Sequence, residues 1–185
     1  MQAMSNPPPV ISRIEYASTL EKHLPALRDL LQRCVNDEPE VSSIGFLAPL
    51  SDADAEAYWK SLSASITGPE PENTLLIATA ADQLVATVTI ARYLKQTHAY
   101  KGEIRKLLVH PDYRRHGLGR AMMDAAERAA VKDLGLELLV LDTATATPAR
   151  EFYRRTGWTE WGICPDYAMD ATRRKNDCSF FVKKL

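Results

Sequence analysis

The sequence has little cysteine: only Cys34, Cys164 and Cys178 among 185 residues. An odd number of cysteines without metal-ligand spacing predicts neither a disulfide framework nor a zinc site. We therefore expect reduced thiols, a cytoplasmic location and no bound metal. A catalytic or redox-active thiol is the less favoured alternative.

Long apolar runs are also missing. No stretch approaches the roughly 18 consecutive apolar residues that span a bilayer, so we expect no membrane association. Residues 1–9 lack the basic start and apolar core of a secretory signal. Their Asn6-Pro7-Pro8-Pro9 run predicts a disordered or extended lead-in to the domain.

Charge of neither sign is in excess. The chain has 23 Lys and Arg against 24 Asp and Glu, a formal net charge of −1. Dedicated nucleic-acid binders usually carry a clear basic excess, so we expect no nucleic-acid partner. The length suits one domain with its own hydrophobic core.

Hydrophobic periodicity predicts alternating strands and helices. Helices are expected over residues 22–35, 51–66, 118–134 and 148–156. Strands are expected over residues 10–16, 74–80, 84–93, 103–109, 136–141, 158–163 and 179–183. Pro25 is expected in the first turn of its helix, where its missing N–H costs nothing. This order predicts a single α/β domain over residues 10–185, with a central mixed twisted sheet flanked by helices.

The segment from Leu107 to Arg120 carries the strongest chemical signal. A strand enters a basic turn, Arg114-Arg115-His116-Gly117-Leu118-Gly119, which opens directly into a helix. The first N–H groups of a helix lack partners and lie at the positive end of its dipole, so they suit an anion. Neither a Walker loop nor the dinucleotide fingerprint is present. Taken alone, the turn is more often a solvated basic loop than a phosphate site.

Two motifs resemble those of the GNAT superfamily of N-acetyltransferases. Residues 114–119 are similar to its Arg/Gln-x-x-Gly-x-Gly/Ala signature. Residues 149–158, Ala-Arg-Glu-Phe-Tyr-Arg-Arg-Thr-Gly-Trp, resemble its second motif, Ala-x-x-Phe/Leu-Tyr-x-x-x-Gly-Phe/Trp. The order of the expected elements is also the order of the family, so the resemblance covers roughly residues 10–185. It implies an N-acetyltransferase domain with a GNAT-like fold.

The resemblance implies that acetyl-CoA binds where two parallel strands separate. The backbone of Leu107 to Val109 would pair with the pantetheine arm, and the amides after Arg114 would hold the diphosphate. The implied cofactor-binding residues are Leu107, Leu108, Val109, Arg114, Arg115, His116, Gly117, Leu118, Gly119 and Arg120. The chain departs from the family at Ala146, where many members have an asparagine that contacts the cofactor. A homodimer stays open, because dimers are frequent in the family.

Acetyl transfer needs a neutral amine and a proton for the departing thiolate. With an ordinary pKa near 10.4, only about one lysine-like amine in 2,500 is neutral at pH 7. Tyr153 matches the family tyrosine that commonly faces the cofactor sulfur, and is the expected general acid. Glu103 matches the base glutamate of the histone-acetylating branch. Asp142, after an apolar strand, is the second candidate base or a ligand of the acceptor's ammonium. A purely surface role for Glu103 and a purely capping role for Asp142 are equally open.

The acceptor is expected to be the primary amine of a small molecule. Phe46, Trp59 and Tyr167 are weak candidates for its pocket, since aromatic residues more often serve packing. Residues 44–50, 141–143 and 165–167 resemble the branch of the family that inactivates the amino-acid toxin tabtoxin. An amino-acid-like compound, a toxin or antibiotic, or a polyamine would all fit. The alternatives are a protein or peptide N-terminal or lysine acetyltransferase, and a non-catalytic acyl-CoA-binding sensor.

Overall fold

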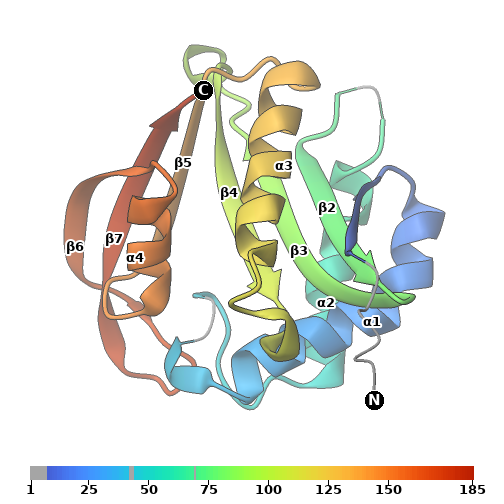
Figure 1. Cartoon of the computed structure of the whole chain (residues 1–185), viewed down its shortest axis with the longest axis horizontal. Helices are drawn as coiled ribbons and strands as arrows, with labels where there is room; N and C mark the ends of the chain where they lie inside the picture. Colours follow the sequence, from blue (N-terminus) through green and yellow to red (C-terminus); the bar gives the residue numbers. More distant parts are fainter. Residues whose placement is uncertain (1–7, 42–43, 69) are drawn as a thin grey trace, which may run out of the picture.

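The chain folds into a seven-stranded mixed sheet with helices on both faces (Figure 1). The structure is a computed structural model and describes residues 8–41, 44–68 and 70–185. The strand order is β1-β2-β3-β4-β5-β7-β6. The strands are β1 (Val10–Ile14), β2 (Asn73–Ala80), β3 (Gln83–Arg92), β4 (Lys101–Val109), β5 (Leu138–Ala144), β6 (Thr159–Met169) and β7 (Lys175–Lys184). The helices are α1 (Ala17–Asn36), α2 (Asp52–Ser61), α3 (Leu118–Lys132) and α4 (Pro148–Arg155). The expected α/β fold is confirmed.

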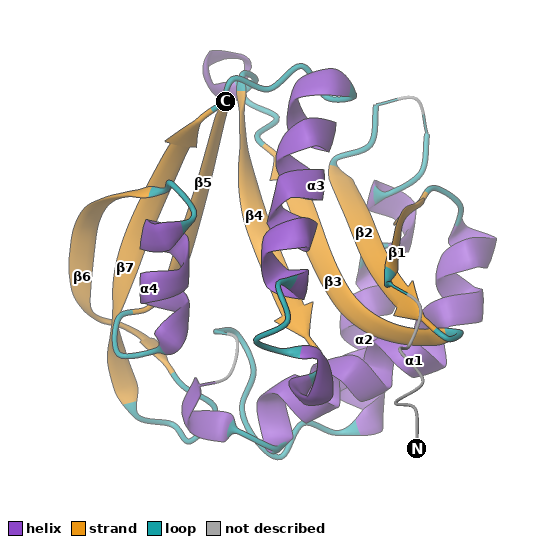
Figure 2. Ribbon diagram, in the orientation of Figure 1, coloured by secondary structure: helices purple, strands orange, loops and turns teal. Residues whose placement is uncertain are grey.

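Two hydrophobic clusters hold the layers together. Helices α3 and α4 pack on one face of the sheet, through residues such as Met122 and Tyr153. Helices α1 and α2 pack on the other face, through residues such as Leu27 and Trp59. Figure 2 shows α3 and α4 in front of the sheet and α1 and α2 towards its back.

Several boundaries differ from those expected. Helix α1 begins at Ala17, so the prediction that Pro25 lies in a first turn is wrong, and this proline sits inside the helix. The burial of one face of α1 outweighs the hydrogen bond that Pro25 removes. Helix α2 ends at Ser61 rather than at residue 66, and Ser51 caps its start, since Ser51 Oγ accepts from the N–H of Asp54 at 3.1 Å.

Strand β5 is also shifted relative to the expected span of 136–141. It runs to Ala144, so Asp142 lies within the strand rather than after it. Its partner β7 explains the extension, because β7 pairs with β5 in antiparallel register as far as Ala144. Most of the predicted lead-in, residues 1–9, lies outside the residues that the structure describes, and that prediction stays untested.

Strands β4 and β5 pair only at their beginnings. Their parallel register contains Lys101–Leu138, Gly102–Leu139 and Glu103–Val140 and ends there. Gly102 permits this contact, because a Cβ at that position would lie 2.8 Å from Leu136 Cδ1. Beyond Glu103 the two strands diverge towards their carboxyl ends (Figure 2). We call this opening the split.

A β-bulge accompanies the divergence. The β3–β4 register slips by one residue between Thr87 and Thr89, opposite Lys106, whose φ is +48°. A bulge bends its strand and increases the local twist. It also changes which face each side chain meets: Ile104 belongs to the cluster under α3, whereas Leu108 belongs to the cluster under α1.

Candidate active site

The turn between β4 and α3 lies at the open end of the split. Arg115 has a φ of +62° and Gly117 a φ of +82°, and helix α3 begins directly afterwards at Leu118. No backbone N–H from Arg115 to Arg120 has a hydrogen-bond partner among the described residues. A Cβ at Gly117 would meet nothing within 4 Å. Successive unpaired amides at a helix start, with open space before them, suit an anion.

The arginine side chains of this turn have other partners. Arg114 donates from Nε to the carbonyl of Val109 at 3.0 Å and pairs with Glu38, which directs its side chain towards α1. Arg120 lies near Asp124 of its own helix, at 3.8 Å. The anion-binding capacity of this loop therefore rests mainly on backbone N–H groups.

The end of β4 offers backbone groups to the split. The N–H of His110 donates to Val85 O of β3 at 2.8 Å. Because neighbouring residues alternate in an antiparallel ladder, the N–H and C=O of Val109 point away from β3. The same alternation directs those of Leu107 towards the split. Leu108, by contrast, pairs with Thr87 and buries its side chain against α1, so its backbone groups face β3.

Tyr153 lies across the split from this strand, on α4. Its ring packs against Phe152, Trp158 and Phe181, with centroid separations of 5.2, 6.1 and 5.6 Å. Its hydroxyl has no hydrogen-bond partner within the described part of the chain. Burial raises the pKa of this hydroxyl above its usual value, and the negative charge of Asp142 raises it further. Tyr153 therefore stays protonated at neutral pH and can donate.

The α4 helix is also close to the loop. A Cβ on Gly119 would lie 3.7 Å from the ring of Phe152, which is ordinary van der Waals contact. The neighbour of Tyr153 in sequence thus packs on the first turn of α3. The structure brings the two motifs, separated by about 40 residues in sequence, to opposite sides of one opening.

Acidic and basic side chains alternate along the other face of the split. Arg105 Nη2 donates to Glu103 Oε2 at 2.6 Å, so the two side chains share a face of β4. Asp142 of β5 lies two residues beyond Val140, the partner of Glu103, and so faces the same way. Burial raises the pKa of Asp142 above its usual value, and the charge of Glu103 adds to this, whereas Lys106 and Arg105 oppose it.

Lys106 is a residue that sequence reasoning missed. The bulge turns its side chain towards α2, where Nζ donates to the carbonyl of Ile44 at 2.7 Å and lies 4.8 Å from the ring centroid of Phe46. Burial lowers the pKa of this ammonium to about 8, although the charge of Asp142 opposes the shift. A one-residue bulge has no sequence signature here, so alternation places Lys106 on the wrong face.

The three predicted aromatic pocket residues have different surroundings. Phe46 lies beside Lys106 and stacks edge-on against Tyr58, at 5.2 Å. Tyr167 is 52% exposed and packs on Phe180, the residue that pairs with Asp142. Trp59 is fully buried, and its Nε1 donates to Leu27 O at 3.0 Å. Trp59 is therefore a core residue between α1 and α2 and does not line the split.

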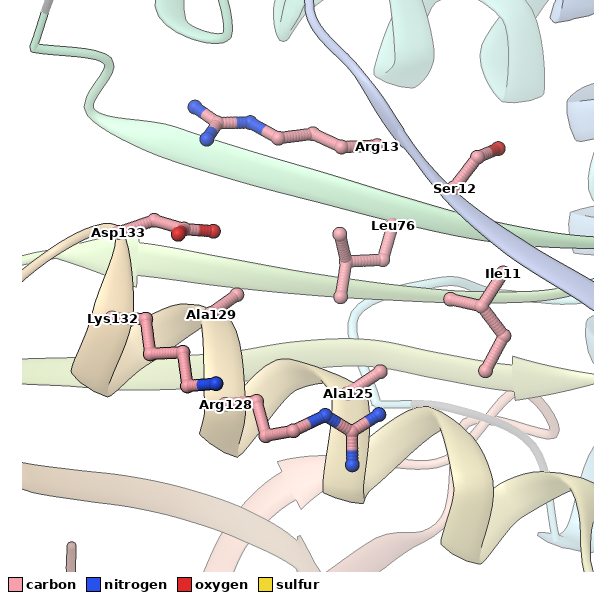
Figure 3. Close-up of a pocket in the computed structure, with 9 residues that line it drawn as sticks. All are labelled: Ile11, Ser12, Arg13, Leu76, Ala125, Arg128, Ala129, Lys132 and Asp133. Carbon is pink, nitrogen blue, oxygen red and sulfur yellow. The ribbon is translucent and has the colours of Figure 1, made fainter.

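Two surface grooves lie elsewhere, along the C-terminal half of α3. One, of about 290 Å³, runs between α3 and β1 and includes Arg13 and Lys132 (Figure 3). The other, of about 490 Å³, lies between α3 and the end of β7. Neither groove is lined by any predicted site residue, so the charged and polar groups of the split make the split the candidate site.

Among residues 8–41, 44–68 and 70–185, no group of three metal-ligating side chains occurs, and none of the helices has the length and hydrophobicity to span a membrane.

Comparison with known families agrees with this geometry. Residues 71–160 match the acetyltransferase (GNAT) domain family. The match runs from the strand pair before β4 to the beginning of β6, and so contains the loop, the split and Tyr153. Over these residues the chain matches a GNAT acetyltransferase domain, and this match supports an N-acetyltransferase.

Solved structures share the whole fold. The acetyltransferase of GNAT family from Streptococcus pneumoniae has a TM-score of 0.73 at 17% identity, over 96% of this chain and 100% of that one. YncA from Salmonella typhimurium, solved with its cofactor acetyl-CoA, has a TM-score of 0.72 at 13% identity, over 97% and 95%. The ribosomal-protein-S18-alanine N-acetyltransferase from Escherichia coli has a TM-score of 0.70 at 22% identity, over 96% and 94%. At such identities the likeness establishes the fold.

Proposed function

We propose that this enzyme transfers an acetyl group from acetyl-CoA directly to the primary amine of a small molecule. The observation that carries the proposal is the split, because three kinds of group surround one opening. They are the unpaired amides at one end, the unpartnered tyrosine hydroxyl at one side and the carboxylates on the strands. The unpaired amides from Arg115 to Arg120 would hold the diphosphate. The outward backbone groups of Leu107 and the N–H of Val109 would pair with the pantetheine arm, since the carbonyl of Val109 already accepts from Arg114. The acetyl-CoA complex of YncA, which has the same fold, supports this donor.

The chemistry follows from the positions of two side chains, Tyr153 and Asp142. The neutral amine attacks the thioester carbonyl, the C–S bond breaks, and the sulfur receives a proton. Tyr153 supplies that proton, because its hydroxyl is protonated and has no partner among the residues the structure describes. We assign Asp142 as the base that accepts the amine proton, since Glu103 is engaged by Arg105, whereas no other side chain of the described residues hydrogen-bonds Asp142.

The small-molecule acceptor is favoured over a protein by two observations. Segments around Gly45, Asp142 and Tyr167 resemble the tabtoxin resistance acetyltransferase, which acts on an amino-acid toxin. Lys106 contacts Ile44 and Phe46 in the chain before α2, so this segment would lie on the acceptor side of the split and limit the approach of a large acceptor. A protein N-terminus is the second candidate, because the fold is shared with the S18-alanine N-acetyltransferase.

A panel of acceptors tests the proposal. The purified enzyme is incubated with acetyl-CoA and amino acids, polyamines or peptides, and CoA release is followed together with the mass of the acetylated product. We expect turnover with at least one small amine and little with peptides. Preferred turnover of peptides would transfer the assignment to the protein-acetylating alternative. Binding of acetyl-CoA without turnover of any amine would support a sensor.

The pH profile gives a separate prediction about the base. Below the pKa of the acceptor amine, kcat/KM falls tenfold per pH unit, because only the neutral amine reacts. Asp142 must be ionised to accept a proton, so the slope should double once the pH falls below its raised pKa. Glu103→Gln should move this bend to lower pH, since it removes a negative charge that raises the pKa of Asp142. Asp142→Asn should abolish the bend; a bend that persists in Asp142→Asn would exclude this residue as the base.

A further inference from the structure

Arg105 is a charged side chain of the split that the mechanism above does not use. Its side chain is 52% exposed. Of its donors, only Nη2 has a partner in the described part of the chain, the carboxylate of Glu103. A guanidinium carries five N–H groups in a fixed fork. Glu103 therefore fixes the direction of the fork and leaves most of its donors available.

The register of the sheet places Arg105 opposite Asp142. Glu103 and Val140 are the last direct partners of β4 and β5. Arg105 and Asp142 each lie two residues further along their strands, and each shares the face of its paired residue. The guanidinium and the carboxylate therefore stand at matching heights on the two sides of the split, where the strands no longer bond to each other.

The charge around this level is mixed. Glu103 and Asp142 are acidic, and Arg105 and Lys106 are basic. Burial raises the pKa of Tyr58, on α2, to about 12, and the positive charge of Arg105 opposes this shift. The guanidinium therefore also acts on the α2 side of the opening. A ligand between the strands meets a cation on β4 and an anion on β5. An acceptor with charges of both signs complements such a site, whereas one with two ammonium groups is repelled by the basic side.

We propose that Arg105 binds the carboxylate of the acceptor, which is therefore an amino-acid-type compound that carries both a primary amine and a carboxylate. The amine lies on the Asp142 side of the split, and the carboxylate accepts N–H groups of the guanidinium fork, which suits a planar two-oxygen acceptor. This inference rests on the proposed function. It selects amino-acid-like compounds and excludes polyamines as the preferred acceptors.

Matched acceptors test the proposal in the full-length enzyme. The best amino acid of the panel is compared with its carboxamide and with the decarboxylated amine, for example ornithine with ornithinamide and putrescine. The wild-type enzyme should use the free acid with at least tenfold higher kcat/KM than either analogue. Arg105→Gln should raise the KM for the acid about tenfold, leave kcat and the KM for acetyl-CoA nearly unchanged, and bring acid and amide within about twofold of each other.

Two variants serve as comparisons. Arg105→Lys keeps the charge but loses the fork, and should retain part of the preference. Arg128→Gln, on α3 beside the grooves away from the split, should change neither KM. The preference is the ratio of kcat/KM for the acid to kcat/KM for an analogue. Dividing this ratio in Arg105→Gln by the same ratio in the wild type cancels the effect of each acceptor's own amine pKa.

The outcomes separate this inference from the proposed function. If the amide or the diamine is used as well as the acid, or if Arg105→Gln retains the full preference, Arg105 is not the carboxylate ligand, although the enzyme is still an amine acetyltransferase. If no amine of any kind consumes acetyl-CoA, the proposed function itself fails.

Discussion

Replacing Tyr153 with phenylalanine is expected to lower kcat at least tenfold and to leave the KM for acetyl-CoA nearly unchanged. General acids typically contribute about 10²–10⁴-fold to rate. The phenyl ring keeps the packing against Phe152, Trp158 and Phe181, and only a hydroxyl without a described partner is removed. Steady-state kinetics with both substrates varied give the two constants.

The control for this prediction removes the same atom elsewhere. Tyr16 follows β1 and is 66% exposed, so Tyr16→Phe should behave as the wild type. Thermal unfolding of both variants checks that neither change disturbs the fold. Unchanged turnover in Tyr153→Phe would remove this residue from the mechanism and leave solvent as the proton donor.

Replacing Gly117 with aspartate is expected to weaken acetyl-CoA binding about 100-fold. The φ of +82° at this position costs a residue with a Cβ about 1–2 kcal/mol. A carboxylate there also faces the diphosphate, and two like charges about 5 Å apart repel by about 3 kcal/mol at an effective dielectric constant of about 20. Solvent screening reduces this term, so we assign about tenfold to each cause. Calorimetric titration with CoA measures the affinity.

Gly117→Asn is the matched variant, because asparagine has nearly the same shape, tolerates the left-handed region and carries no charge. It should bind CoA at least tenfold more tightly than Gly117→Asp. The difference should shrink as salt is added, since salt screens the repulsion. Equal affinities of the two variants at low salt would mean that this loop does not hold the diphosphate. Both changes point into open space, so neither should prevent folding.

The sequence predicts the order of elements well because each helix and strand carries its own local pattern. The cap at Ser51 and the loop before α3 are local features, and both occur where the residues indicate. Boundaries depend on tertiary partners, and are less predictable. Strand β5 extends to Ala144 because β7 pairs with it, and no local pattern records that partner.

The candidate site is only partly visible in the sequence. Motif residues such as Tyr153 can be found because the family signature includes them. Arg105 and Lys106 were missed because their position depends on a sheet register and on a bulge, neither of which leaves a local pattern. Trp59 is a weak pocket candidate on sequence alone, because an aromatic residue in a core and one in a pocket look alike in sequence, and the structure buries it fully.

The bulge at Lys106 divides β4 into two segments that are free to change independently. Under the proposed function, residues before it, such as Glu103 and Arg105, would face the acceptor, and residues after it, such as Val109, would offer backbone groups to the donor. Since the donor half depends on main-chain atoms, side chains in the acceptor half are able to vary without altering how the cofactor is held. A lineage of such enzymes can therefore acquire new substrates by point substitutions within three residues of one strand. A one-residue deletion at the bulge would instead disrupt both halves at once.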